Sequence, residues 1–97
     1  MLKTRIAGIG GYVPEKVITN KDLEQWMDTS DEWIRQRSGI EERRWIEPGK
    51  DTTASMGVQA SRQALERASC DVEEVDAIIF GCLVSDYIFP GSGVLLQ

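Results

Sequence analysis

A nearly continuous apolar run, DAIIFGCLV at Asp76–Val84, most constrains what this chain can fold into. Such a run is typical of a strand that is buried on both faces, as in a parallel sheet covered by helices. Before it come a predicted strand at Lys3–Ile9 and a long predicted helix, which is capped by Asp51–Thr53 and ends near Ser69. This order of strand, helices and strand predicts a right-handed crossover unit in a parallel or mixed sheet, and therefore an α/β fold.

The predicted long helix carries small side chains on one face. They are Gly57, Ala60, Ser61, Ala64 and Ala68. A glycine inside a helix costs about 1 kcal/mol relative to alanine. We therefore expect Gly57 to permit a close approach to a sheet or to another helix.

Three glycines, Gly8, Gly10 and Gly11, lie at the end of the first predicted strand, in which we expect Ile6 and Ile9 to be buried. Their spacing matches neither the GxGxxG motif nor the P-loop, and no helix follows directly. They indicate a structural turn rather than a phosphate site.

A short helix is predicted over Lys21–Met27, with Thr19 or Asn20 as its cap. Its apolar stripe includes Trp26. We expect this tryptophan to belong to the core rather than to a ligand site.

The stretch Thr29–Arg44, TSDEWIRQRSGIEERR, carries the most unusual chemistry of the chain. Thr29 and Glu32 can form a capping box at the start of a helix of about two turns. Gly39 can end that helix, because glycine adopts a positive φ without a steric clash.

Thr29, Trp33 and Arg37 are spaced four residues apart and therefore share one face of this helix. Together they could hold an aromatic ring beside a phosphate, because tryptophan offers a stacking plane and arginine a bidentate fork. The alternative is that Trp33 packs inward and that Arg37 pairs with Asp31 or another neighbour. The spacing alone leaves both interpretations open.

Acidic residues outnumber basic ones by 16 to 11 without any lysine- or arginine-rich run, so general nucleic-acid binding is not expected. Four arginines are nevertheless clustered and could bind phosphates locally: Arg35, Arg37, Arg43 and Arg44. No apolar run approaches the roughly 18–20 residues that span a bilayer, and no secretory signal is recognisable. We therefore expect no membrane partner.

The two cysteines, Cys70 and Cys82, are too few for a disulfide framework, which favours a reducing, cytoplasmic location. We expect Cys82 to be a buried, inert thiol rather than a nucleophile. Because the chain has no histidine, neither a histidine metal site nor a Ser-His or Cys-His pair can form within it.

Five motifs resemble, in order and spacing, the N-terminal region of β-ketoacyl-acyl-carrier-protein synthase III, the condensing enzyme that starts bacterial fatty-acid synthesis. They are the TSDEW-I-x-x-R-S-G-I-x-x-R block that begins at Thr29, Gly8–Pro14, Thr19–Leu23, Thr53–Met56 and Phe89–Pro90. The resemblance covers nearly the whole chain, and the block from Thr29 is its most specific part.

The resemblance implies part of the N-terminal half of a thiolase fold, in which two similar α/β halves stack in five layers, and a homodimeric enzyme. It implies an acyltransferase that joins an acyl-CoA starter to malonyl-acyl carrier protein with release of carbon dioxide; the acyl-CoA is a substrate, and no cofactor is expected. The family's catalytic cysteine, histidine and asparagine would lie beyond Gln97. Residues 1–97 are therefore expected to be an incomplete domain, cut before the catalytic cysteine and inactive by itself.

The resemblance also assigns roles to four residues. Trp33 matches the family tryptophan that stacks on the CoA adenine, Thr29 a residue that hydrogen-bonds near it, and Arg37 one that faces the CoA phosphates. Phe89 matches a loop phenylalanine that reaches across the dimer to close the partner's acyl pocket. Residues 82–86 depart from the family's frequent Thr-x-Thr-Pro-Asp run, which leaves the starter preference open.

Two other interpretations stay open. The chain could be a catalytically inactive, truncated thiolase-like module that self-associates through exposed apolar surface and strand edges. It could instead belong to a related condensing enzyme with another acceptor. A reading frame that continues past Gln97 and encodes the three catalytic residues favours the enzyme, and a stop codon there favours the inactive module.

Overall fold

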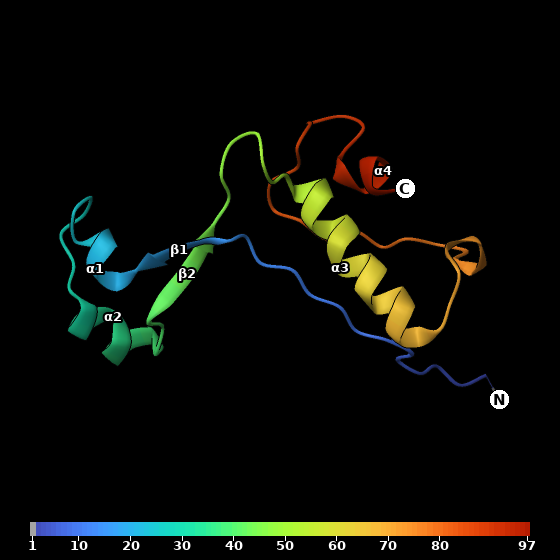
Figure 1. The fold of residues 1–97 in the computed structure, drawn as a ribbon, viewed down its shortest axis with the longest axis horizontal. Coiled ribbons are helices and arrows are strands. Elements are labelled where there is room, and N and C mark those ends of the chain that lie inside the picture. Colours follow the sequence, from blue (N-terminus) through green and yellow to red (C-terminus); the bar gives the residue numbers. More distant parts are fainter. Residues whose placement is uncertain (1) are drawn as a thin grey trace. The chain divides into compact units, whose positions relative to one another are not determined.

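The computed structural model describes residues 2–97, which divide into two units. One unit comprises residues 13–50, and the other comprises residues 2–12 together with residues 51–97. The first contains the only sheet found among residues 2–97, and the second contains the longest helix (Figure 1).

The unit of residues 13–50 is built on an antiparallel pair of strands, β1 at Lys16–Thr19 and β2 at Glu42–Trp45 (Figure 1). Two short helices lie between them in sequence, α1 at Asn20–Leu23 and α2 at Asp31–Ser38. Few apolar side chains are buried here, although Ile18 is only 4% exposed. Hydrogen bonds, rather than apolar packing, therefore fix much of the arrangement of the strands and helices in this unit.

α1 begins one residue before the predicted start at Lys21 and ends earlier than predicted. Thr19 is its cap: the hydroxyl accepts a hydrogen bond from the backbone nitrogen of Asp22 at 3.2 Å, and the Asp22 carboxylate accepts one from the Thr19 backbone nitrogen at 2.7 Å. The helix stops at Leu23 instead of continuing to Met27. Four residues are too few to sustain a helix by propensity alone, so the reciprocal cap is its main local support.

Trp26 is not a core residue, so this prediction was wrong. Its side chain is 57% exposed and stacks on Trp45 of β2, with ring centroids 5.4 Å apart. The prediction assumed a helical stripe that includes Trp26, but α1 ends at Leu23 and the following residues form a turn. The indole therefore covers the end of a strand instead of filling a helix face.

The unit of residues 2–12 and 51–97 contains α3 at Thr53–Ala68, the 3₁₀ turn η1 at Val72–Glu74 and α4 at Ser92–Leu96. Both predicted ends of the long helix are confirmed. Thr52 caps α3 in a reciprocal capping box, and Ser69 ends it in the left-handed conformation with a φ of 51°.

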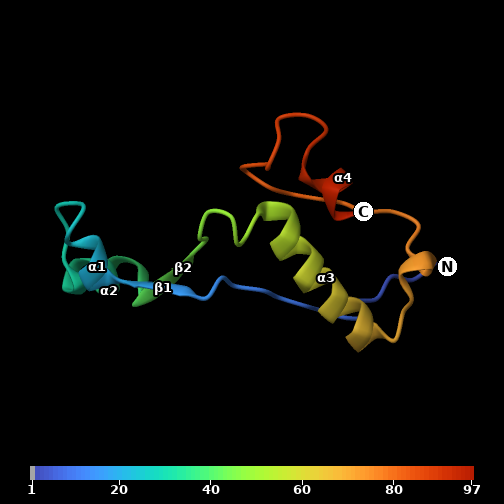
Figure 2. The ribbon, with the colours of Figure 1, turned by 45° about the horizontal axis from the view of Figure 1, so that its top comes forward.

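Gly57, inside α3, permits close packing as the sequence predicts. A Cβ atom on Gly57 would lie 2.7 Å from Cδ1 of Leu96 and 3.3 Å from Cε2 of Phe80. α4 lies beside the N-terminal half of α3 in both views (Figures 1 and 2). The absent side chain lets α4 and Phe80 approach the helix closely.

The small face of α3 continues toward its C-terminal end, where the extended segment of residues 2–12 passes it (Figures 1 and 2). A Cβ atom on Gly8 would lie 3.0 Å from Cβ of Ala68, and one on Gly10 would lie 2.7 Å from the backbone nitrogen of Ala64. The expected close approach is confirmed, and the partner is an extended segment. The turn predicted at these glycines does not form.

Three hydrogen bonds hold this N-terminal segment to residues of α3 or the residue before its cap. They join Gly11 N to Gln63 Oε1 at 2.9 Å, Arg67 Nη1 to Ile9 O at 2.9 Å, and Tyr12 Oη to Asp51 Oδ1 at 2.7 Å. Ile9, which we expected to be buried, is 67% exposed. The segment is held through its backbone and its glycines, so its isoleucines are not covered.

The strands predicted at Lys3–Ile9 and Asp76–Val84 do not form among residues 2–97, and these two predictions were wrong. Ile6 is 82% exposed, and Ile79 and Leu83 are each 100% exposed. A strand needs a neighbouring strand to satisfy its backbone hydrogen bonds. Neither segment has such a neighbour within the described residues, so both stay extended.

Across residues 2–97 we find no helix with the length and apolar character required to cross a bilayer.

Candidate functional site

α2 carries the candidate ligand-binding face and owes its ends to local chemistry. Its cap is Ser30, whose hydroxyl accepts a hydrogen bond from the Trp33 backbone nitrogen at 3.1 Å. The prediction that Thr29 caps this helix was therefore wrong by one residue. Gly39 ends α2 as predicted, with a φ of 73° and its nitrogen 2.9 Å from the Arg35 carbonyl oxygen.

Trp33 and Arg37 lie together on the exposed side of α2. The guanidinium carbon of Arg37 is 5.6 Å from the centroid of the Trp33 ring, and Trp33 is 56% exposed. This is cation–π geometry, in which the ring face attracts the guanidinium. The alternative of an inward-packed Trp33 and an Arg37–Asp31 pair was wrong, because Asp31 pairs with Arg35 at 3.5 Å.

A hollow of about 310 Å³ adjoins Trp33 and is lined by Asp28, Thr29, Ser30 and Trp33. The structure thus brings together two of the predicted site residues, Thr29 and Trp33, at one surface hollow. Arg37 does not line the hollow but contacts the ring that does. Within residues 2–97, the Thr29 hydroxyl has no hydrogen-bond partner and is available to a ligand.

The four clustered arginines have different roles. Arg43 donates to the Ile18 carbonyl and to Asn20 Oδ1, Arg44 donates to the Pro14 carbonyl, and Arg35 pairs with acids. In the described part of the chain, Arg37 makes neither a hydrogen bond nor an ion pair. Of the four, Arg37 is therefore the one whose donors are open to an anion.

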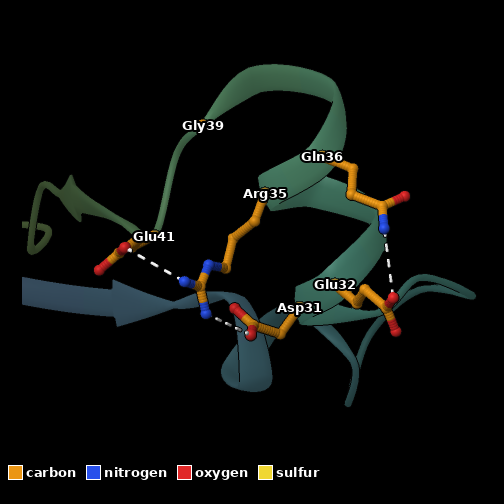
Figure 3. Close-up of a pocket in the computed structure, with 6 residues that line it drawn as sticks. All are labelled: Asp31, Glu32, Arg35, Gln36, Gly39 and Glu41. Carbon is orange, nitrogen blue, oxygen red and sulfur yellow. Dashed lines mark hydrogen bonds and ion pairs between the residues drawn. The ribbon is translucent and has the colours of Figure 1, made fainter.

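A second hollow, of about 470 Å³, was not anticipated from the sequence (Figure 3). It is lined by Asp31, Glu32, Arg35, Gln36, Gly39 and Glu41. Figure 3 shows Arg35 reaching between two carboxylates, with nitrogen–oxygen distances of 3.5 Å to Asp31 and 3.7 Å to Glu41. These groups are exposed and already paired, so they contribute little binding energy for a further ion.

The sequence did not predict a role for Asp86, which follows the apolar run. Its carboxylate accepts hydrogen bonds from the backbone nitrogens of Thr53 and Ala54, both at 2.8 Å, and from the Ser92 hydroxyl at 3.1 Å. The Ala54 backbone bond and then that of Thr53 hold the pKa of Asp86 below its usual value. The carboxylate satisfies free N–H groups at the start of α3.

The remaining predicted site residue, Phe89, lies in the loop before α4 and is 89% exposed. It belongs to the unit of residues 2–12 and 51–97. The two residues before it, Tyr87 and Ile88, are also exposed. This loop presents consecutive apolar side chains to solvent, which is uncommon unless they contact another molecule or segment.

Neither cysteine has the surroundings of a nucleophile. Partial burial, and then the nearby charge of Glu74, raise the pKa of the Cys70 thiol. Cys82 was expected to be buried; it is exposed, with Sγ 3.2 Å from Ser85 Oγ, because the strand meant to bury it does not form. Among residues 2–97, no group of three or more cysteine or carboxylate side chains could hold a metal ion.

Comparison with known proteins supports the resemblance along the entire chain, although no protein-family model matches it. The β-ketoacyl-[acyl-carrier-protein] synthase III of Alkalilimnicola ehrlichii is 46% identical over 97 residues, which are 100% of this chain and 30% of that protein. The chain thus spans about 30% of the length of the curated relatives that it matches.

Solved structures give the same result. The crystal structure of 3-oxoacyl-[acyl-carrier-protein] synthase III from Aquifex aeolicus matches with a TM-score of 0.90 at 44% identity, over 97% of this chain and 30% of that one. The priming β-ketosynthase of the R1128 polyketide biosynthetic pathway matches with a TM-score of 0.88 at 38% identity, over 95% and 27% of the two chains. Over its whole length, this chain is therefore homologous to the N-terminal portion of β-ketoacyl-[acyl-carrier-protein] synthase III and has the thiolase-like α/β fold of that enzyme family.

Proposed function

We propose that this chain supplies the CoA-binding portion of a condensing enzyme that initiates fatty-acid synthesis. In this proposal the longer protein joins an acyl-CoA starter to malonyl-acyl carrier protein with loss of carbon dioxide, as a cytoplasmic homodimer. The homology to β-ketoacyl-[acyl-carrier-protein] synthase III supports the reaction class. Because the chain spans about 30% of its relatives, the reaction is assigned to the longer protein rather than to these residues alone.

The observation that carries the CoA-binding role is the Arg37–Trp33 contact beside the hollow at Thr29. Arg37 covers one face of the indole, so the proposal places adenine on the opposite face. Base–aromatic stacking contributes about 1–3 kcal/mol per base. The unpaired guanidinium would then bind the CoA phosphates in charge-assisted hydrogen bonds.

The charge of the hollow favours the same orientation of the nucleotide. Asp28 lines the hollow with Thr29 and Trp33, and its carboxylate would repel a phosphate placed there. A carboxylate and a hydroxyl can both accept a hydrogen bond from the exocyclic amino group of adenine. The proposal therefore puts the adenine end in the hollow and the phosphates on the Arg37 side.

Calorimetric titration of CoA into the purified full-length protein tests this role. Trp33→Ala is expected to weaken CoA binding by about 5- to 150-fold, which corresponds to the stacking range of about 1–3 kcal/mol. Trp26→Ala is the matched control, because Trp26 is an equally exposed tryptophan of the same unit that stacks on Trp45. Unchanged affinity in Trp33→Ala, or an equal loss in both variants, would contradict the proposal.

The proposal also assigns Phe89 to the acyl pocket of the partner protomer. Its 89% exposure leaves a large apolar side chain free to contact another subunit. Phe89→Ala is expected to change the preferred length of the acyl-CoA starter while CoA affinity stays the same. An unchanged starter profile would remove Phe89 from the pocket.

A second candidate function is priming in polyketide synthesis, which the structural match to the R1128 priming β-ketosynthase supports. It uses the same proposed CoA site with another acceptor. Transfer assays with a panel of acyl-CoA starters and carrier proteins separate the two functions. If the protein transfers no acyl group and light scattering shows that it self-associates, the inactive, truncated module is the better description.

A further inference from the structure

The helix that carries Trp33 and Arg37 is held in place by polar contacts. None of the residues of α2 is buried, so apolar packing does little to define its position. Its first backbone nitrogen, that of Asp31, donates to Glu24 Oε1 at 2.9 Å, and its side chains form exposed ion pairs. The placement of the Trp33–Arg37 face therefore depends on whatever fixes the two ends of this helix.

One buried side chain contacts both ends. Asn20 is 1% exposed and lies at the start of α1, outside α2. Its Nδ2 donates to Asp31 Oδ1 at 2.9 Å and to the Ile40 carbonyl oxygen at 2.8 Å. Asp31 is the first residue of α2, and Ile40 directly follows the residue that ends it. A single amide group thus hydrogen-bonds to the first residue of α2 and to the residue that follows its C-cap.

The same amide is anchored to the sheet. Asn20 Oδ1 accepts from Arg43 Nη2 at 2.7 Å, and Nη1 of that arginine donates to the Ile18 carbonyl at 3.2 Å. The Asn20 backbone nitrogen also donates to the Glu41 carbonyl oxygen at 3.2 Å. Both amide hydrogens and the amide oxygen form hydrogen bonds, three of the four that this side chain can make, so Asn20 links α2 to β1 and β2.

We propose that Asn20 is a positioning residue for the CoA site, which orients α2 so that Trp33 and Arg37 present their face to the nucleotide. This inference rests on the proposed CoA-binding function. Asparagine is required because the site needs two donors and one acceptor on a short side chain. Aspartate has a similar shape and keeps the acceptor for Arg43, but in the place of Nδ2 it would put a carboxylate oxygen against Asp31 Oδ1 and the Ile40 carbonyl oxygen.

Steady-state kinetics of the full-length enzyme with acyl-CoA as the varied substrate test the proposal. Asn20→Asp is expected to raise the KM for acyl-CoA about 10-fold with kcat nearly unchanged, because a small misplacement of binding groups weakens binding strongly. A purely structural role would instead lower the active fraction, and so the apparent kcat, without changing KM. Thermal unfolding of each variant reports whether it is folded.

Two further variants sharpen the test. The exchange Asn20→Asp with Asp31→Asn restores one amide–carboxylate hydrogen bond between these positions and is expected to reverse part of the increase in KM. Thr52→Ala is the matched control: it removes an equivalent threonine cap from α3, a helix that carries neither Trp33 nor Arg37. Its KM is expected to stay at the wild-type value.

Trp33→Ala in the same assay tests the CoA site separately from the positioning role of Asn20. If Trp33→Ala raises KM and folded Asn20→Asp does not, the positioning role is wrong and the CoA site stands. If Trp33→Ala leaves KM unchanged, the CoA site is wrong and the positioning role falls with it. If Asn20→Asp does not fold, Asn20→Ser, which keeps one donor, takes its place, and a wild-type KM there overturns the positioning role.

Discussion

Gly10 passes so close to α3 that a Cβ atom on it would lie 2.7 Å from the backbone nitrogen of Ala64. The neighbour is helix backbone, which cannot move aside as a flexible side chain can. Gly10→Ala is therefore expected to destabilise the fold by about 1–3 kcal/mol, the range for an overpacked contact. Urea denaturation measures this change in the free energy of unfolding.

Gly11→Ala is the control for that measurement, because a Cβ atom on Gly11 would meet nothing within 4 Å. Its effect is expected to lie within about 0.5 kcal/mol of zero, as for most exposed substitutions. Equal losses at the two glycines would show that the close approach to α3 is not what constrains Gly10.

Substitutions at Ser30 and Thr29 are expected to have different effects, the first on stability and the second on CoA binding. Ser30 caps α2 through its hydroxyl, so Ser30→Ala is expected to lower the free energy of unfolding by about 1 kcal/mol. Thr29→Ala removes no hydrogen bond within residues 2–97 and is expected to weaken CoA binding while stability is kept. Denaturant titration and calorimetry on both variants check this, and a stability loss in Thr29→Ala that matches Ser30→Ala would contradict it.

Arg37 is expected to contact the phosphates of CoA, and Arg35 is not. Arg37→Ala should weaken CoA binding by roughly 10- to 150-fold, the scale of a hydrogen bond to a charged group. Arg35→Ala should leave the affinity nearly unchanged, because Arg35 is already paired with Asp31 and Glu41. The Arg37 effect should shrink as salt is raised from about 0.05 M to 0.5 M, because salt screens exposed charges. A salt-independent effect would argue against a phosphate contact.

Asp86 is expected to make the stability of the fold depend on pH. Its pKa is lowered in the folded state, so the stabilisation that its carboxylate gives is fully present above the unfolded-state pKa, at about pH 4. That stabilisation is lost as the pH falls through the lower, folded-state pKa. Wild type should therefore be more stable than Asp86→Asn at pH 7 in urea denaturation, and the difference should shrink toward pH 3. A difference that stays constant over this range would exclude the helix-terminus contact as its source.

The two stacked tryptophans are expected to stabilise each other. A double-mutant cycle with Trp26→Ala and Trp45→Ala should give a coupling energy of about 0.5–1.5 kcal/mol, the usual range for aromatic pairs. Trp26→Ala with Trp33→Ala should be additive, because no ring contact joins that pair among residues 2–97. Additivity in the first pair would mean that stacking of the two rings adds no stability beyond that of the apolar surface each ring buries.

Part of the candidate site could be predicted from the sequence. The four-residue spacing of Thr29, Trp33 and Arg37 put them on one face, and the structure brings Thr29 and Trp33 to one hollow with Arg37 on the indole. Spacing could not choose between an exposed and an inward tryptophan, since that depends on which face of α2 meets the rest of the unit. The role of Asn20 was hidden for the same reason, because its partners at Asp31, Ile40 and Arg43 are 11 to 23 residues away.

The sequence by itself determined the family resemblance and most helix ends. Thr19, Thr52, Gly39 and Ser69 act within one turn of their own position, and each cap or stop is where local chemistry places it. Only the tertiary structure decided the state of the two predicted strands, the exposure of Trp26 and the partner of the small face of α3. Helix hydrogen bonds close over four residues, whereas strand pairing and burial require a distant segment to be present as a neighbour.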